Sequence, residues 1–198
     1  MSASTWPPEG PLPPGTEPSA AGPVAAAVLV PIHEQDDRPH LVLTKRRSDL
    51  RRHAGEISFP GGRRDPEDAD LSETALREAE EEIGLARDQV SLLGELPPTS
   101  TFATNYVIHP FVASIPQGLV WLPSEREVEQ VLELPLADVR ASRGTTTIER
   151  RGISFQTAAY LLDGHVIWGA TARIIEHLLE RIDESTPGAL RLRTADPA

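Results

Sequence analysis

The residues best suited to chemistry lie in the stretch LREAEEEIGL, residues 76–85, where four glutamates occupy five positions. Carboxylates three or four residues apart on a helix repel each other by about 0.2–0.5 kcal/mol per pair, and near a helix C-terminus they also oppose the dipole. A hard divalent cation would remove this repulsion, because Mg²⁺ binds carboxylate oxygens together with substrate phosphates. The run therefore indicates either a solvated acidic surface or a metal site.

A helix over this stretch would separate the four glutamates. Asp70 and Glu73 form an N-terminal capping pair and Gly84 is a natural stop, so the helix is expected to begin near residue 71 and end before Gly84. At 100° per residue its apolar side chains share one face, which would pack on a core. Three glutamates fall at the edge of that face and one points to solvent: the three are Glu78, Glu81 and Glu82, and the fourth is Glu80.

A basic segment precedes this helix. Five of the chain's 19 lysines and arginines lie within residues 45–52, just before Gly61 and Gly62. The segment is either a solvated loop or a phosphate clamp, for which arginine is suited by its fork of donors. His53 lies in the same loop, where both a structural role and a substrate contact are open.

Composition restricts the class of protein. The 198 residues suit one domain, and the net charge of −11 disfavours nucleic acid or an anionic membrane as a partner. The chain has no cysteine, no basic start followed by an apolar run, and no apolar stretch long enough to span a bilayer, so a cytoplasmic protein is expected. Residues 1–22 and 185–198 are expected to be disordered or flexible tails around a domain at 23–184.

The remaining pattern predicts many short strands and two helices. Strands are expected at 24–32, 40–46, 55–60, 89–96, 106–115 and 118–121, with more between residues 145 and 168. Residues 124–134 are read as one or two helical turns before Pro135, and residues 169–182 carry a single apolar stripe typical of a helix. This order indicates an α/β protein with a mixed sheet packed between helices.

The acidic helix and the loop before it resemble a known sequence motif. GGRRDPEDADLSETALREAEEEIGL is similar to the Nudix box, G-x5-E-x7-R-E-U-x-E-E-x-G-U, in which U is a bulky apolar residue. One departure is that Asp68 replaces the first glutamate, with one extra residue before Arg77. The matching positions are Gly62, Arg77, Glu78, Glu81, Glu82, Gly84 and Leu85.

The segment LTKRRSDLRRHAGEISFPGG, residues 43–62, resembles the one that precedes the box in the coenzyme A pyrophosphatase branch of this family. Segments 127–136 and 167–175 also look like that branch, so the resemblance covers most of residues 40–180. The matching positions upstream of the box are Thr44, Arg46, Arg51, Gly55, Phe59, Pro60, Gly61 and Gly62.

The resemblance implies a Nudix-type α/β/α sandwich and Mg²⁺- or Mn²⁺-dependent hydrolysis of a pyrophosphate bond. The implied substrate is a small nucleotide, coenzyme A or a derivative, giving adenosine 3′,5′-bisphosphate and 4′-phosphopantetheine; a homodimer is compatible with the sequence. The alternatives are hydrolysis of ADP-ribose, NADH or a nucleoside triphosphate, and a Nudix module that senses a nucleotide without cleaving it.

Each implied role falls on a numbered residue of this chain. Arg77 would orient the glutamates, with Asp68 as the first candidate to hold it, and Glu81 would be a metal ligand or the general base. The implied metal ligands are Glu78, Glu82, Glu81 and the carbonyl of Gly61. The implied substrate-binding residues are Arg46, Arg51, His53 and Gly62, and alternative bases are Glu125, Glu127 and Glu129.

Overall fold

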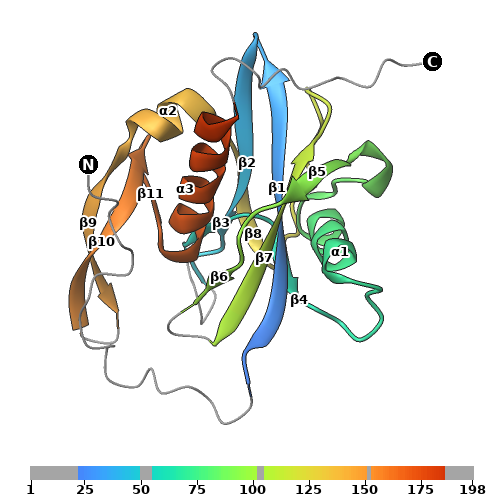
Figure 1. Ribbon diagram of the computed structural model, residues 1–198, viewed down its shortest axis with the longest axis horizontal. Coiled ribbons are helices and arrows are strands. Elements are labelled where there is room, and N and C mark those ends of the chain that lie inside the picture. The colour runs from blue at the N-terminus through green and yellow to red at the C-terminus, as the bar shows by residue number, and fades with distance from the viewer. Residues whose placement is uncertain (1–21, 50–54, 102–104, 151–152, 186–198) are drawn as a thin grey trace.

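Residues 22–49, 55–101, 105–150 and 153–185 are described by a computed structural model. The expected N-terminal tail lies outside these ranges except for residue 22, and the expected C-terminal tail lies outside them except for residue 185. Residues 50–54 of the basic segment also lie outside the described ranges. The described residues form two sheets and three α-helices (Figure 1).

The two longest apolar runs form the centre of the main sheet. β1 (Val24–Gln35) and β2 (Arg38–Arg46) pair antiparallel through a tight turn at Asp36 and Asp37, whose φ angles of 52° and 57° are typical of a type I′ hairpin. The sheet runs in the order β3-β2-β1-β7-β5, with β4 paired to β1, β6 to β7 and β8 to β2. The other strands are β3 (Ile57–Ser58), β4 (Gly61–Arg63), β5 (Ser91–Glu95), β6 (Thr99–Ser100), β7 (Tyr106–Ser114) and β8 (Val128–Pro135).

Helices cover both faces of this sheet, which explains why β1 is almost uniformly apolar. Side chains alternate along β1, so that Ala27 and Leu29 join the core under α1 (Leu71–Ile83). Val30 and Ile32 join the core under α2 (Leu136–Ala141) and α3 (Gly169–Glu184). The expected α/β/α arrangement is therefore confirmed (Figure 1). A short 3₁₀ turn, η1 (Arg87–Gln89), follows α1.

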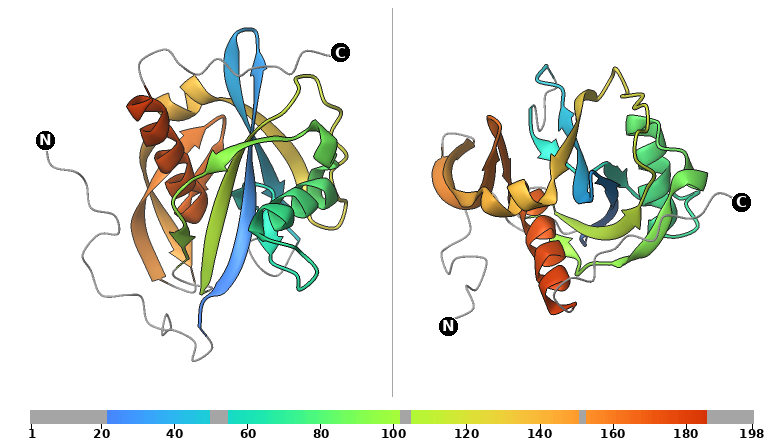
Figure 2. Two further views of the ribbon diagram at one scale, coloured as in Figure 1. Left: turned by 45° about the vertical axis from the view of Figure 1, so that its right-hand side comes forward. Right: turned by 90° about the horizontal axis from the view of Figure 1, so that it is seen from above.

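A second sheet of three strands lies beyond α3. It consists of β9 (Arg143–Arg150), β10 (Ile153–Leu162) and β11 (His165–Trp168), in the order β11-β10-β9. Both views in Figure 2 place this sheet and α1 on opposite sides of the molecule. Within the described ranges, no helix is both long and apolar enough to cross a membrane.

Most sequence expectations for the elements are correct, and two are wrong. The apolar stripe of α3 is buried as expected. Residues 118–121 are not a strand, and β8 replaces the helical turns expected at 124–134. The strand forms because residues 128–135 pair with β2. Its side chains also follow a strand period of two, since Val128, Leu132 and Leu134 are buried while Glu129 and Glu133 are exposed.

His33 is a buried ionisable group on β1. Its side chain is 1% exposed, its ring stacks on that of His40 at 5.2 Å, and its Nε2 lies 2.7 Å from Glu133 Oε2. Burial lowers the pKa of His33 below its usual value, and the nearby Glu133 carboxylate opposes this only in part. The folded protein therefore favours the neutral imidazole.

This burial predicts a loss of stability in mild acid. The unfolded chain protonates His33 at a higher pH than the folded chain, so the stabilisation is present above about pH 6.5 and is lost as the pH falls. Between about pH 7.5 and about pH 5.5, the free energy of unfolding should fall more in the wild type than in His33→Gln, as urea titrations can measure. An equal fall in the two proteins would contradict the prediction.

Candidate active site

Helix α1 begins and ends where the sequence predicts, and this fixes the direction of its glutamates. The side chain of Asp70 accepts a hydrogen bond from the Glu73 backbone N–H at 3.0 Å, and Gly84 closes the helix with a φ of 71°. A loop then covers the helix end, because the backbone N–H of Leu122 donates to the Ile83 carbonyl and that of Ser124 donates to the Glu82 carbonyl at 2.8 Å. Carbonyls that would lack helical partners are thus satisfied.

The two glycines of β4 pass directly under α1. Gly61 has a φ of 158° and pairs with Val28 of β1, and a side chain there would lie 2.3 Å from the Ala27 carbonyl oxygen. A Cβ at Gly62 would lie 2.4 Å from Oε1 of Glu78. Only glycine therefore allows β4 to approach both β1 and the Glu78 carboxylate.

Glu78 and Glu82 share a poorly solvated space above these glycines. Burial, followed by the charges of Glu78 and Glu127, raises the pKa of Glu82 to about 8, and a backbone hydrogen bond from Gly61 opposes this only partly. Burial also raises the pKa of Glu78. The Oε2 atom of Glu82 is buried without a hydrogen-bond partner. The positive charges of Arg77 near Glu78 and of Arg46 near Glu82 oppose these shifts without cancelling them.

These residues fit a divalent cation. Mg²⁺ commonly uses one or two protein carboxylates and takes its other ligands from water and phosphate. Glu78 and Glu82 supply hard oxygen donors, and the orphaned Oε2 of Glu82 is an acceptor in need of a positive partner. Within the described ranges, no three histidine or acidic side chains already converge on a metal position. The two glutamates would therefore bind the ion together with backbone, water or substrate oxygens.

Arg77 is the centre of a hydrogen-bond network beside this pair. Its Nε lies 3.0 Å from Asp68 Oδ1 and one terminal nitrogen lies 3.0 Å from Glu78 Oε1, while the other reaches Glu81 at 3.3 Å. Asp68 is buried and also accepts from the Thr74 hydroxyl at 2.8 Å. Arg77 holds the pKa of Asp68 well below its usual range. Asp68 therefore occupies the position from which it can orient Arg77, as the sequence suggested.

The described part of the basic segment is paired with acidic residues at the start of β8, just before it and within the segment itself. Lys45 Nζ lies 2.6 Å from Glu129 and Arg46 lies 2.9 Å from Glu127, while Arg47 pairs with Asp49 at 2.9 Å. Of these acids, Glu127 is the one whose charge raises the pKa of both Glu78 and Glu82. Glu127 therefore connects the arginine segment to the carboxylate pair.

The structure brings most of the predicted site residues together. Gly61, Gly62, Arg77, Glu78 and Glu82 adjoin one another, and Arg46 joins them through Glu127. Glu81 lies at the solvent margin, since its side chain is 61% exposed. Arg51 and His53 lie outside the described residues.

Sequence reasoning did not anticipate Thr74 and did not rank Glu127. No signal in the sequence distinguished Glu127 from Glu125 and Glu129, because its place beside Arg46 depends on how the turn before β8 packs.

Comparison with known proteins agrees with this geometry. The NUDIX domain profile matches residues 23–154. A protein of Photorhabdus laumondii named uncharacterized Nudix hydrolase NudL is 39% identical over 159 residues, which cover 79% of this chain and 84% of the relative. Its namesake from Yersinia enterocolitica is 39% identical over 160 residues, covering 80% and 81%.

Two solved structures share the fold at low sequence identity. The Nudix hydrolase RenU of M. smegmatis aligns with a TM-score of 0.57 at 16% identity, covering 86% of this chain and 91% of that one. The NUDIX domain of Shewanella oneidensis NrtR, complexed with ADP ribose, aligns with a TM-score of 0.53 at 16% identity, covering 81% and 89%. At these identities the likeness concerns the fold alone.

The close approach of Gly62 to Glu78 generates a prediction. Gly62→Ala must displace the flexible Glu78 carboxylate but leaves the backbone of the core in place. We expect the affinity for Mn²⁺, measured by calorimetry, to fall about tenfold or more. Gly144→Ala is the matched control, because a Cβ there meets only a Leu161 methyl at 3.6 Å. An unchanged affinity in Gly62→Ala would place Glu78 away from the ion.

Proposed function

Because this chain belongs to the NUDIX domain family of hydrolases, we propose that it cleaves the pyrophosphate bond of coenzyme A or a derivative with the help of Mg²⁺ or Mn²⁺. The observation that carries the metal-dependent part is the half-buried pair Glu78 and Glu82, in which the buried Oε2 of Glu82 has no hydrogen-bond partner among the described residues. The products would be adenosine 3′,5′-bisphosphate and 4′-phosphopantetheine. A cytoplasmic location is part of the proposal, in keeping with the absence of cysteine.

The choice of coenzyme A is supported by the residues before the box. Thr44, Arg46, Gly55 and Phe59 match the coenzyme A pyrophosphatase pattern. In the structure, Phe59 is buried and Thr44 hydrogen-bonds Ser58, so these two matches hold β3 against β2. The arginine at the end of β2 is thereby directed toward the acidic helix, where a phosphate would lie.

The site residues would have three separate roles in hydrolysis, which are metal binding, orientation of a ligand and substrate binding. Glu78 and Glu82 would hold the ion, with the Gly61 carbonyl and Glu81 as further ligands. A bound divalent ion neutralises phosphate charge and lowers the pKa of a water molecule. Arg77, held by Asp68, keeps the Glu78 carboxylate in place. Arg46 and Gly62 would contact the substrate, as would Arg51 and His53.

The general base is proposed to be Glu127 or Glu81. Glu127 ranks above Glu125 and Glu129 because, of these three acids, it is the one whose charge raises the pKa of both Glu78 and Glu82. Either residue would accept a proton from the attacking water. All these groups belong to one chain, so assembly as a homodimer would leave the chemistry unchanged.

The first prediction concerns the buried ligand. With Mg²⁺ and coenzyme A, Glu82→Gln should reduce the rate by about a hundredfold or more, because the ion loses a charged ligand. Mass spectrometry of the products identifies the bond that is cleaved. Glu80→Gln is the control on the same helix, since Glu80 is exposed and pairs with Arg87 at 3.2 Å. A Glu82→Gln rate within a few-fold of wild type would overturn the assignment.

The second prediction concerns the basic segment. Arg46→Ala should raise KM for coenzyme A, and Arg51→Ala should do the same, because each removes a phosphate donor. Arg140→Ala, which breaks only an ion pair with Asp183, should leave KM unchanged. Repeating the assay with ADP-ribose separates recognition of coenzyme A from recognition of any pyrophosphate. KM values unaffected by either substitution would mean that the segment is merely solvated.

A further inference from the structure

Strand β9 forms a long edge of the second sheet. It pairs with β10 over eight consecutive residue pairs, from Arg143 opposite Tyr160 to Arg150 opposite Ile153, without a shift of register. In the described part of the chain, β9 has no strand on its other side. Its outer backbone groups are therefore free to pair with a further strand.

The β5 and β3 edges of the main sheet are protected in ways that β9 is not. β5 has only five residues, and a register shift lies between Leu92 and Gly94, where Gly94 has a φ of 156°. β3 has only two residues. Proteins commonly protect an edge by shortness, a bulge, proline or charged side chains. β9, with the sequence RGTTTIER, is eight residues long, has no bulge and no proline, and carries its charged residues only at its two ends.

The charges on β9 are arranged so that the strand complements itself. In an antiparallel pair of two copies centred on Thr146, Arg143 faces Glu149 of the other copy, and Thr145 faces Thr147. The pairing with β10 places these four side chains on one face of the sheet, and all four are exposed. Two ion pairs and two threonine pairs would therefore form across a two-fold axis.

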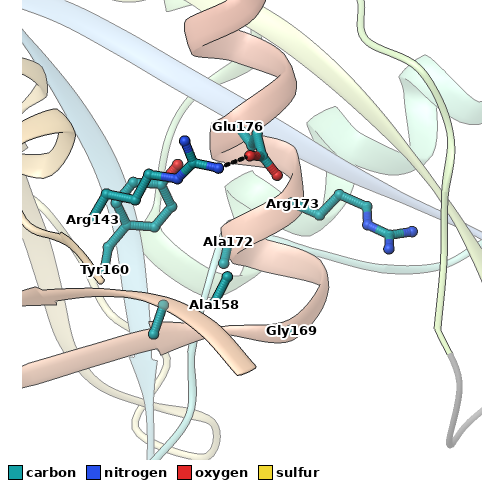
Figure 3. A pocket seen from close by; sticks show the side chains of 8 residues that line it. Arg143, Ala158, Tyr160, Gly169, Ala172, Arg173 and Glu176 are labelled. Atoms are coloured by element: carbon teal, nitrogen blue, oxygen red, sulfur yellow. Dashed lines mark hydrogen bonds and ion pairs between the residues drawn. The ribbon is translucent and has the colours of Figure 1, made fainter. Parts of the chain in front are cut away.

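From this edge and its charges, we propose that two copies of the chain associate through β9, joining their second sheets into one six-stranded sheet. Arg143 is held in position by Glu176 of α3, as Figure 3 shows, yet its side chain remains 58% exposed and can reach a partner. Because α1 lies on the opposite side of the molecule, the two candidate active sites would face away from each other (Figure 2).

The absence of cysteine allows a direct test with introduced cysteines. Thr146→Cys would place two sulfur-bearing side chains across the axis, where Cβ atoms of facing residues lie about 4.5–5.5 Å apart. Mild oxidation should convert Thr146→Cys into a disulfide-linked dimer, whereas Leu93→Cys, exposed on the β5 edge, should remain monomeric. Linkage through position 93 but not 146, or through neither position, would overturn the proposal.

A second measurement tests the charges without a covalent bond. Sedimentation equilibrium of the full chain should show association from 21.5 kDa to twice that mass as concentration rises. Glu149→Arg sets like charges against each other and should weaken the dimer about tenfold. Glu95→Arg, on the β5 edge, should not weaken it. A wild type that stays monomeric to about 200 µM, or equal effects of both substitutions, would overturn the proposal.

Discussion

The placement of the site depends on one electrostatic constraint, which is that Glu78 and Glu82 lie close together and are both partly removed from solvent. Burial disfavours the ionised forms of both carboxyls and so raises the pKa of each, and the charge of Glu78 raises the pKa of Glu82 further. A folded protein can tolerate this arrangement when the charge is completed by another group. The neighbouring elements are arranged around that requirement, with the glycines of β4 below the carboxylates and Arg77 at one side.

Arg77 shows how a rigid site is obtained from flexible side chains. Asp68 is buried, accepts a hydrogen bond from the Thr74 hydroxyl and accepts another from Nε of Arg77. The terminal nitrogens of the guanidinium in turn contact Glu78 and Glu81. The aspartate is shorter than the glutamate of the usual motif and one residue farther from the arginine along the chain. The extra residue in the loop compensates for the shorter side chain, so the ion pair still forms at 3.0 Å.

Local patterns in the sequence predicted α1, its caps, the apolar stripe of α3 and the grouping of Glu78 with Glu82, because these depend on residues a few positions apart. The features that failed depend on distant pairing. Residues 124–134 were expected to form one or two helical turns before Pro135, whereas pairing with β2 makes a strand from Val128 onward. For the same reason, sequence alone could not rank Glu127, which lies in the turn just before β8 and meets Arg46 at the end of β2. The strands of the second sheet, by contrast, were expected between residues 145 and 168, and each pairs with its neighbour along the chain.

The hydrogen bonds from Leu122 and Ser124 to the last carbonyls of α1 have a consequence for how the protein could evolve. They attach the end of α1 to the segment that leads into β8, so the positions of these two elements are coupled. An insertion between these attachment points and Glu127 would alter the reach of that acid without moving Glu82. An insertion before Leu122 would leave both undisturbed. New substrate preferences could therefore arise by insertions between Ser124 and Glu127, while Glu78 and Glu82 keep their positions.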